Sequence, residues 1–288
     1  MKLSFNIRVG DRIVGQLASA VGLTPDQEVV DATLFDVCRE FAFSSSSAEE
    51  FSHWYLRSEV LSKYLSPEFS PSREAETTRR FDAAEAACRL ANERLVDPWS
   101  RASLTQSVWR RARSIVGSVL GTFNWEEFPS SCGFGPGASV GLRRRVAFLQ
   151  NKWELSTHIT EEALPYHSAF LRWADLPQIP DVMSVVDGNR VTTVPKSWKT
   201  DRTIAIEPDW NMFYQKGVGR MIRRRLQRFG VLLPDAQDKN RALARLGSWT
   251  DSLSTLDLSA ASDSISVALC EALLPPDWLK VLMDLRSP

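Results

Sequence analysis

Signals for α-helices recur along the chain, in the residues that begin and end a helix and, towards the C-terminal half, in apolar residues at steps of three and four. Thr24-Pro25 combines an N-cap with a proline at the first helical position and precedes a predicted helix over Val29–Phe41. Further helices are predicted from Pro71 to about Leu95, up to Asp97-Pro98, and over about Leu104–Leu120. Residues 1–130 are therefore expected to be mainly helical.

The pattern changes between residues 190 and 229. Two β-rich runs, Arg190–Val194 and Thr203–Ile206, flank Pro195–Arg202 and predict a hairpin with a basic tip. An amphipathic helix is predicted from Asp209 to about Phe229. Its apolar side consists of Trp210, Phe213, Tyr214, Met221, Ile222 and Leu226.

The last part of the chain predicts a short strand and two helices. The strand covers Ser254–Leu258, and the helices cover Ile265–Leu274 and Asp277–Arg286. The second helix carries Trp278, Val281, Leu282 and Leu285 on one face. We expect this stripe to be exposed here and to be covered by polypeptide beyond residue 288.

Composition limits the function classes. The chain is 43% hydrophobic, enough for a sizeable core, and contains no apolar run of about 18 residues that would predict a membrane span. Its four cysteines are scattered without a CxxC pair, which favours reduced thiols in a cytosolic protein. The net charge is zero, but residues 101–228 hold 19 Lys and Arg against 11 Asp and Glu. This local excess indicates a site for a polyanion.

Gly133–Ser139 contains the densest group of glycines in the chain. It is either a tight turn before Arg143-Arg144-Arg145 or a place where a ligand approaches the backbone closely. The segment lacks the Lys-Ser/Thr ending of a P-loop, which excludes a Walker-type ATPase.

Two aspartates near the end of the chain are candidate ligands. Asp257 lies in the predicted strand, opposite its leucine neighbours, and small residues follow it, so a metal and a phosphate have room to approach. The alternative is an aspartate that hydrogen-bonds a turn. Asp263 precedes the predicted helix at Ile265, where an N-cap belongs. A cap and a ligand contact are compatible.

Basic residues form two further candidate sites. Lys196, Lys199 and Arg202 are spaced three apart in the hairpin tip, close enough to converge on one triphosphate. The amphipathic helix carries a basic face that fits the phosphate backbone of RNA. That face consists of Lys216, Arg220, Arg223, Arg224 and Arg228. The alternative for both groups is that they are ordinary charged surface in contact with solvent and bind no ligand.

These segments, in this order, resemble a known family. VPKSWKTDRTIAIEP (residues 194–208) resembles the basic fingers motif of the Q-beta-like replicase beta subunits of RNA bacteriophages, the levivirus RNA-directed RNA polymerases. TLDLSAASDSIS (residues 255–266) is similar to their first palm motif, and LCEALLPPDWLKVLMDLRSP extends the similarity to residue 288. FGPGAS (residues 134–139) resembles another segment of that family.

The resemblance implies template-directed nucleotidyl transfer on a right-hand fold of the α+β class, with a helical N-terminal region (1–130), fingers (131–250) and the start of a palm (251–288). It implies that Asp257 is a catalytic residue and a ligand of two Mg²⁺ ions, and that Asp263 reads the 2′-hydroxyl of the incoming nucleotide. Lys196, Lys199 and Arg202 would hold its triphosphate.

One feature departs from the family pattern. The 288 residues contain no Asp-Asp pair, whereas the family places further metal ligands in a Gly-Asp-Asp hairpin. We therefore expect the N-terminal part of a replicase that is inactive alone, since one carboxylate cannot hold two metals ~4 Å apart. A non-catalytic RNA-binding module is the alternative. A reverse transcriptase is a weaker candidate, because Asp263 stands where deoxynucleotide selection favours a bulky side chain.

The resemblance also implies the partners. They are an RNA template and product, ribonucleoside triphosphates, and the host elongation factors Tu and Ts with a ribosomal small-subunit protein. No membrane is implied. The expected location is the cytoplasm of the bacterial host.

Overall fold

The computed structural model describes residues 47, 49–52, 55, 70–95, 103–175, 183–197, 200–231, 235–256, 258 and 260–287. The helix predicted over residues 29–41 lies outside them. Helices predominate among the described residues, and two two-stranded sheets accompany them, so the fold is α+β. No helix in this described part is long and apolar enough to cross a membrane.

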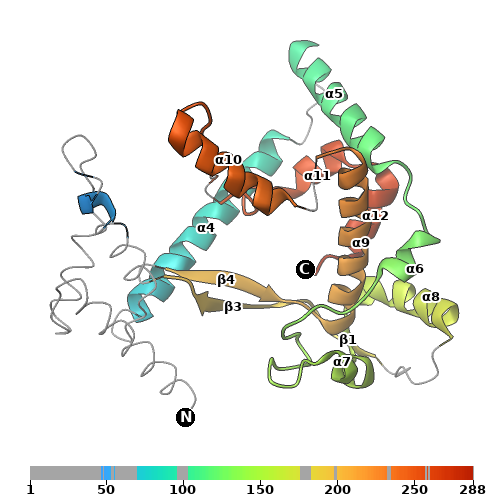
Figure 1. Ribbon diagram of the computed structural model, residues 1–288. Coiled ribbons are helices and arrows are strands. Elements are labelled where there is room, and N and C mark those ends of the chain that lie inside the picture. The colour runs from blue at the N-terminus through green and yellow to red at the C-terminus, as the bar shows by residue number, and fades with distance from the viewer. Residues whose placement is uncertain are drawn as a thin grey trace. The chain divides into compact units, whose positions relative to one another are not determined.

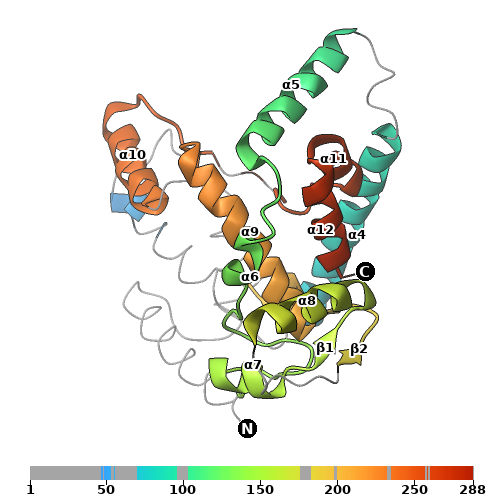
Figure 2. The same cartoon turned by 90° about the vertical axis from the view of Figure 1, so that its right-hand side faces the viewer.

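The helices and strands are labelled in Figure 1, except β2, which is labelled in Figure 2. The helices are α4 (Ser70–Arg94), α5 (Ser103–Leu120), α6 (Glu127–Ser131), α7 (Leu149–Leu155), α8 (Leu164–Ala174), α9 (Asp209–Arg228), α10 (Ala236–Thr250), α11 (Val267–Leu273) and α12 (Pro276–Leu285), with a 3-10 turn at Glu161–Ala163. Strand β1 (His158–Ile159) pairs in parallel with β2 (Ser184–Val185), and β3 (Arg190–Pro195) pairs with β4 (Asp201–Ile206). The hairpin and the helices predicted near α4, α5, α9 and α12 are confirmed.

The chain divides into two compact units. One comprises Met1–Asp82 with Thr192–Ile204, and the other comprises Ala83–Val191 with Ala205–Pro288. The first contains most of the β3–β4 hairpin. The second contains α5 to α9 and α10 to α12.

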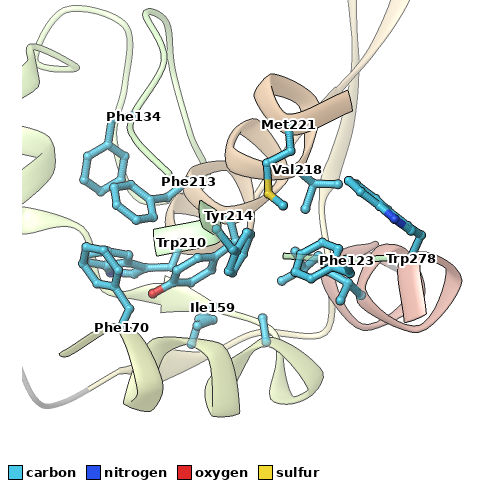
Figure 3. Packing of buried hydrophobic residues seen from close by; sticks show 14 of the residues in the cluster. Phe123, Phe134, Ile159, Phe170, Trp210, Phe213, Tyr214, Val218, Met221 and Trp278 are labelled. Atoms are coloured by element: carbon cyan, nitrogen blue, oxygen red, sulfur yellow. The ribbon is translucent and has the colours of Figure 1, made fainter. Parts of the chain in front are cut away.

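The core of the second unit is built around α9. Trp210, Phe213, Tyr214, Val218 and Met221 of this helix are each at most 1% exposed (Figure 3). Helices α5, α6 and α12 and strand β1 pack against α9, and Figure 2 shows α6 lying beside it. The predicted apolar side of this helix thus forms the centre of the hydrophobic core.

Helix α12 corrects one expectation. Three residues of its predicted stripe, Trp278, Val281 and Leu285, are at most 1% exposed, and Leu282 is partly buried, so most of the stripe is not exposed. Trp278 donates a hydrogen bond from Nε1 to the carbonyl of Gly121 at 2.9 Å, and its ring meets Phe123 edge-on with 4.8 Å between centroids. The expectation was wrong because α9 and the segment after α5 already supply the apolar surface that covers it.

The strand predicted over residues 254–258 is a second correction. Ser254, Thr255, Leu256 and Leu258 have no regular secondary structure, and the two leucines are 90% and 75% exposed. None of the strands in the described ranges pairs with this segment. A lone strand leaves its backbone N–H and C=O groups without partners, so the local pattern is insufficient to form it.

Candidate nucleic-acid interface

The hairpin tip presents two cations to solvent. Lys196 directly follows β3, and Arg202 is the second residue of β4. Between them the amide of Ser197 donates to the carbonyl of Thr200 at 3.0 Å, which closes the turn. Both cationic side chains are exposed, and neither has an ion pair or hydrogen bond with the described part of the chain. Lys199 lies outside the described residues.

A buried ion pair supports the hairpin. Asp201, at the start of β4, accepts a hydrogen bond from Arg73 Nε of α4 at 3.1 Å, and the two side chains are 5% and 6% exposed. Thr77 Oγ1, also from α4, accepts a hydrogen bond from the Asp201 amide at 2.9 Å. Asp201 was not predicted as a functional residue. The available signal was a single acidic residue between Lys199 and Arg202.

The acidic segment is described only in part. Asp257 lies outside the described residues. Asp263 lies in a turn, exposed, and its carboxylate accepts a hydrogen bond from Ser262 Oγ at 3.0 Å. Asp263 is not the N-cap of the next helix: α11 begins at Val267, and Ser266 Oγ accepts from the amide of Leu269 at 3.3 Å. The predicted cap was placed three residues too early.

The described residues show no group of three His, Cys, Asp or Glu side chains arranged to hold a metal ion. A metal site within these residues would need further oxygen ligands, such as those of a bound nucleotide. Mg²⁺ is commonly held in this way, by one or two carboxylates and substrate phosphates. The exposed carboxylate of Asp263 is a hard oxygen donor of the same type.

The predicted basic face of α9 divides into two groups. Lys216 Nζ donates to the carbonyl of Phe134 at 2.7 Å, and Arg220 donates to the carbonyl of Ser131 at 2.8 Å. Arg224 Nε donates to the Glu127 carboxylate at 2.8 Å. These three cations hold α6 and the start of the glycine-rich segment against α9.

The remaining members of that face, Arg223 and Arg228, are exposed. Their side chains make no ion pair or hydrogen bond with the residues that the structure describes. They are therefore the members of the predicted face that are most available to a ligand.

The glycine-rich segment is held by the buried Lys152 and the partly buried Lys216. The carbonyl of Gly135 accepts a hydrogen bond from Lys152 Nζ at 2.6 Å, next to the bond from Lys216 to Phe134. Burial lowers the pKa of Lys152, with Asp209 opposing the shift and Lys216 reinforcing it. Burial, and then repulsion from Arg220, lowers the pKa of Lys216. The alternative of a tight turn before the arginines therefore has structural support, because these lysines are occupied by the loop itself.

Asp209 joins three segments and was expected only to begin a helix. Its carboxylate is completely buried and accepts hydrogen bonds from the amides of Gly141 (3.3 Å), Thr157 (3.2 Å) and His158 (3.1 Å). The same group lies 3.3 Å from Nδ1 of His158. The start of α9 thereby fixes both the loop around residue 141 and the start of β1.

Comparison with known proteins identifies the family. Residues 5–288 match the family described as RNA replicase, beta-chain. The chain is 42% identical over 246 residues to the RNA-directed RNA polymerase subunit beta of Escherichia virus Qbeta, covering 83% of this chain and 41% of that protein. It is 39% identical to the corresponding subunit of Enterobacteria phage SP (87% and 44% covered) and 36% identical to the polymerase beta chain of Escherichia phage MS2 (81% and 44%).

The chain spans less than half the length of these curated relatives. Their similarity nevertheless extends over more than four-fifths of the chain and includes the hairpin, the glycine-rich segment and α9 within the matched residues 5–288. The chain belongs to the RNA replicase beta-chain family.

Proposed function

We propose that this chain contributes to an RNA-directed RNA polymerase that copies phage RNA by template-directed nucleotidyl transfer. The family match over residues 5–288 is the observation that carries the proposal. In it, residues 1–130 are an N-terminal region, residues 131–250 are fingers, and residues 251–288 begin the palm of a right-hand fold.

The hairpin tip is proposed to bind the triphosphate of the incoming nucleotide. Lys196 and Arg202 are exposed and have no carboxylate partner among the described residues, so their charge is available to an anion. An arginine supplies a fixed two-pronged donor and a lysine a mobile point charge, a combination suited to phosphate oxygens. With Lys199 they would offset the charge that develops on the leaving pyrophosphate.

The acidic segment is proposed to bind the metal ions and to recognise the sugar of the nucleotide. Asp257 would be a ligand of two divalent ions, with Mg²⁺ as the proposed metal. When bound, such ions favour deprotonation of the attacking 3′-hydroxyl and stabilise the leaving group. Asp263, with its exposed carboxylate, would accept a hydrogen bond from the 2′-hydroxyl that distinguishes ribonucleotides.

Nucleotide binding by the full chain tests the hairpin. Titration calorimetry with ATP and AMP is expected to show tighter binding of ATP, and Lys196→Ala and Arg202→Ala should each weaken ATP roughly tenfold, about the value of one charge-assisted hydrogen bond. Arg190→Ala is the matched control, since Arg190 is also exposed but begins β3 at the other end of the strand. Unchanged ATP affinity in both tip variants would contradict the assignment.

A non-catalytic RNA-binding module is the second candidate, and the exposed Arg223 and Arg228 favour it. It predicts RNA binding that weakens steeply with salt, without preference for ATP over AMP. A clear ATP preference abolished by the hairpin variants would exclude this module. The family resemblance adds two further points to the proposal. The partners are the host elongation factors Tu and Ts and a ribosomal small-subunit protein, and the location is the cytoplasm of the bacterial host.

A further inference from the structure

Arg143, Arg144 and Arg145 form an exposed cationic turn in the second unit. All three side chains are exposed, and none has an ion pair or hydrogen bond with another described residue. By contrast, Arg224 and Arg225 of the same unit both pair with Glu127. Three consecutive cations without a partner carry an electrostatic repulsion that a polyanion would relieve.

The base of this turn is held rigidly. The amide of Val140 donates to the carbonyl of Glu207 at 3.0 Å, and the amide of Gly141 donates to the buried Asp209 carboxylate at 3.3 Å. Leu142 is only 5% exposed. The amide of Val146 donates to the carbonyl of Arg143 at 2.9 Å and closes the turn. A ligand therefore meets arginines on a fixed backbone, so binding orders only their side chains.

Gly141 shows how closely the base is packed. A Cβ atom at this position would lie 2.5 Å from His158 Nδ1 and 2.6 Å from an oxygen of Asp209. Glycine is therefore needed for the backbone to approach the buried carboxylate. The exposed turn and the buried acid are parts of one local structure.

An aromatic side chain follows the arginines. Phe148, the residue that precedes α7, is 69% exposed, and its neighbours Leu149 and Val146 are 62% and 43% exposed. Figure 1 shows the loop that leads into α7. Phe148 thus places an exposed ring three residues after guanidinium groups that have no partner among the described residues. Proteins bind single strands with this combination, in which cations contact the phosphates and rings stack on the bases.

We propose that residues 143–148 bind single-stranded RNA, with the three arginines on backbone phosphates and the Phe148 ring stacked on an unpaired base. This deepens the proposed function, on which it rests, by naming a surface that contacts the RNA strand. An acidic polypeptide would satisfy the charges but has no flat base for the ring. A duplex would offer phosphates but keeps its bases stacked inside.

The charge part is tested on the full chain with a fluorescent 12-nucleotide RNA of unstructured sequence. In R143A/R144A/R145A the slope of log K against log salt should fall by about 2, because each phosphate contact on a single strand contributes roughly 0.7. The triple lysine variant should keep most of the slope. R110A/R111A/R113A, which removes three exposed arginines from α5 of the same unit, is the matched control for lost net charge.

The aromatic part has its own variant. Phe148→Ala should lower the affinity for single-stranded RNA roughly 5- to 100-fold, the effect of losing one base–aromatic stack. Phe148→Tyr should retain the affinity. Affinity for duplex RNA should not change in Phe148→Ala. RNA containing 4-thiouridine should crosslink to the peptide that carries Phe148 in the unmodified chain.

The outcomes separate this inference from the proposed function. If the chain binds RNA and ATP but the arginine and Phe148 variants behave as the unmodified chain, only the inference is overturned. Equal losses in the α5 control would also overturn it, since the effect would be one of net charge. If the arginine variant loses affinity for poly-glutamate as much as for RNA and Phe148→Ala has no effect, the surface binds acidic protein. Failure of ATP binding and of the hairpin variants would count against the proposed function separately.

Discussion

Two glycines of α9, two residues apart, should respond to alanine in opposite directions. A Cβ atom on Gly217 would lie 2.6 Å from Cys132 Sγ and 3.1 Å from Cys132 Cα, whereas a Cβ atom on Gly219 would meet nothing within 4 Å. Alanine in a helix interior gains up to about 1 kcal/mol over glycine. At Gly217 this gain is opposed by overpacking, which typically costs about 1–3 kcal/mol.

The expected result is therefore a sign difference. Gly219→Ala should raise the free energy of unfolding by about 0.5–1 kcal/mol, and Gly217→Ala should lower it by about 1–2 kcal/mol. Urea unfolding followed by tryptophan fluorescence measures both, because Trp210 lies in the same helix and is completely buried. Cys132→Ala should restore part of the loss at Gly217 in a double-mutant cycle. If Gly217→Ala is as stabilising as Gly219→Ala, the close contact between α6 and α9 is refuted.

Three further predictions concern the buried polar groups. Asp209→Ala should cost about 3–5 kcal/mol in urea unfolding, because three backbone amides lose their charged acceptor; a cost below about 1 kcal/mol would contradict the role of this carboxylate. Arg73→Ala should destabilise by about 3–5 kcal/mol, since it leaves Asp201 charged and buried, and thermal melting that matches the unmodified chain would oppose this. Burial raises the pKa of the Cys132 thiol from 9.0 to about 12, so the unfolded chain releases this proton first and stability should fall as pH rises from about 9 to 12. In Cys132→Ala the free energy of unfolding should fall less steeply with pH, by up to about 1.4 kcal/mol per pH unit. Identical plots of unfolding free energy against alkaline pH for the variant and the unmodified chain would disprove this.

The local pattern was sufficient wherever one element could form from its own spacing. Helices α9 and α12 were predicted from the spacing of their own apolar residues, α4 from the residues that begin and end it, and the β3–β4 hairpin from its two β-rich runs. Helix α10 was not predicted, although Leu243, Leu246 and Trp249 follow a step of three. All three are exposed, so packing contributes little to distinguishing that helix.

The candidate residues were less completely predicted. Lys196 and Arg202 are exposed and have no ion-pair partner in the described part of the chain, which agrees with the availability expected of anion-binding groups. Lys216, Arg220 and Arg224 are instead occupied by α6 and the adjoining loop. Spacing along a helix shows which side chains share a face, but it does not show which of them find a carbonyl or carboxylate from elsewhere in the chain.

The sequence by itself determined the family, the charge distribution and the faces of the helices, because motif order and periodicity are properties of neighbouring positions. Only the tertiary structure decided that α12 is covered by α9, that Ser254–Leu256 lacks a strand partner, and that Asp209 connects the arginine turn to the core. Those outcomes depend on contacts between residues tens of positions apart. Burial and hydrogen bonding at such distances are decided when the elements pack together.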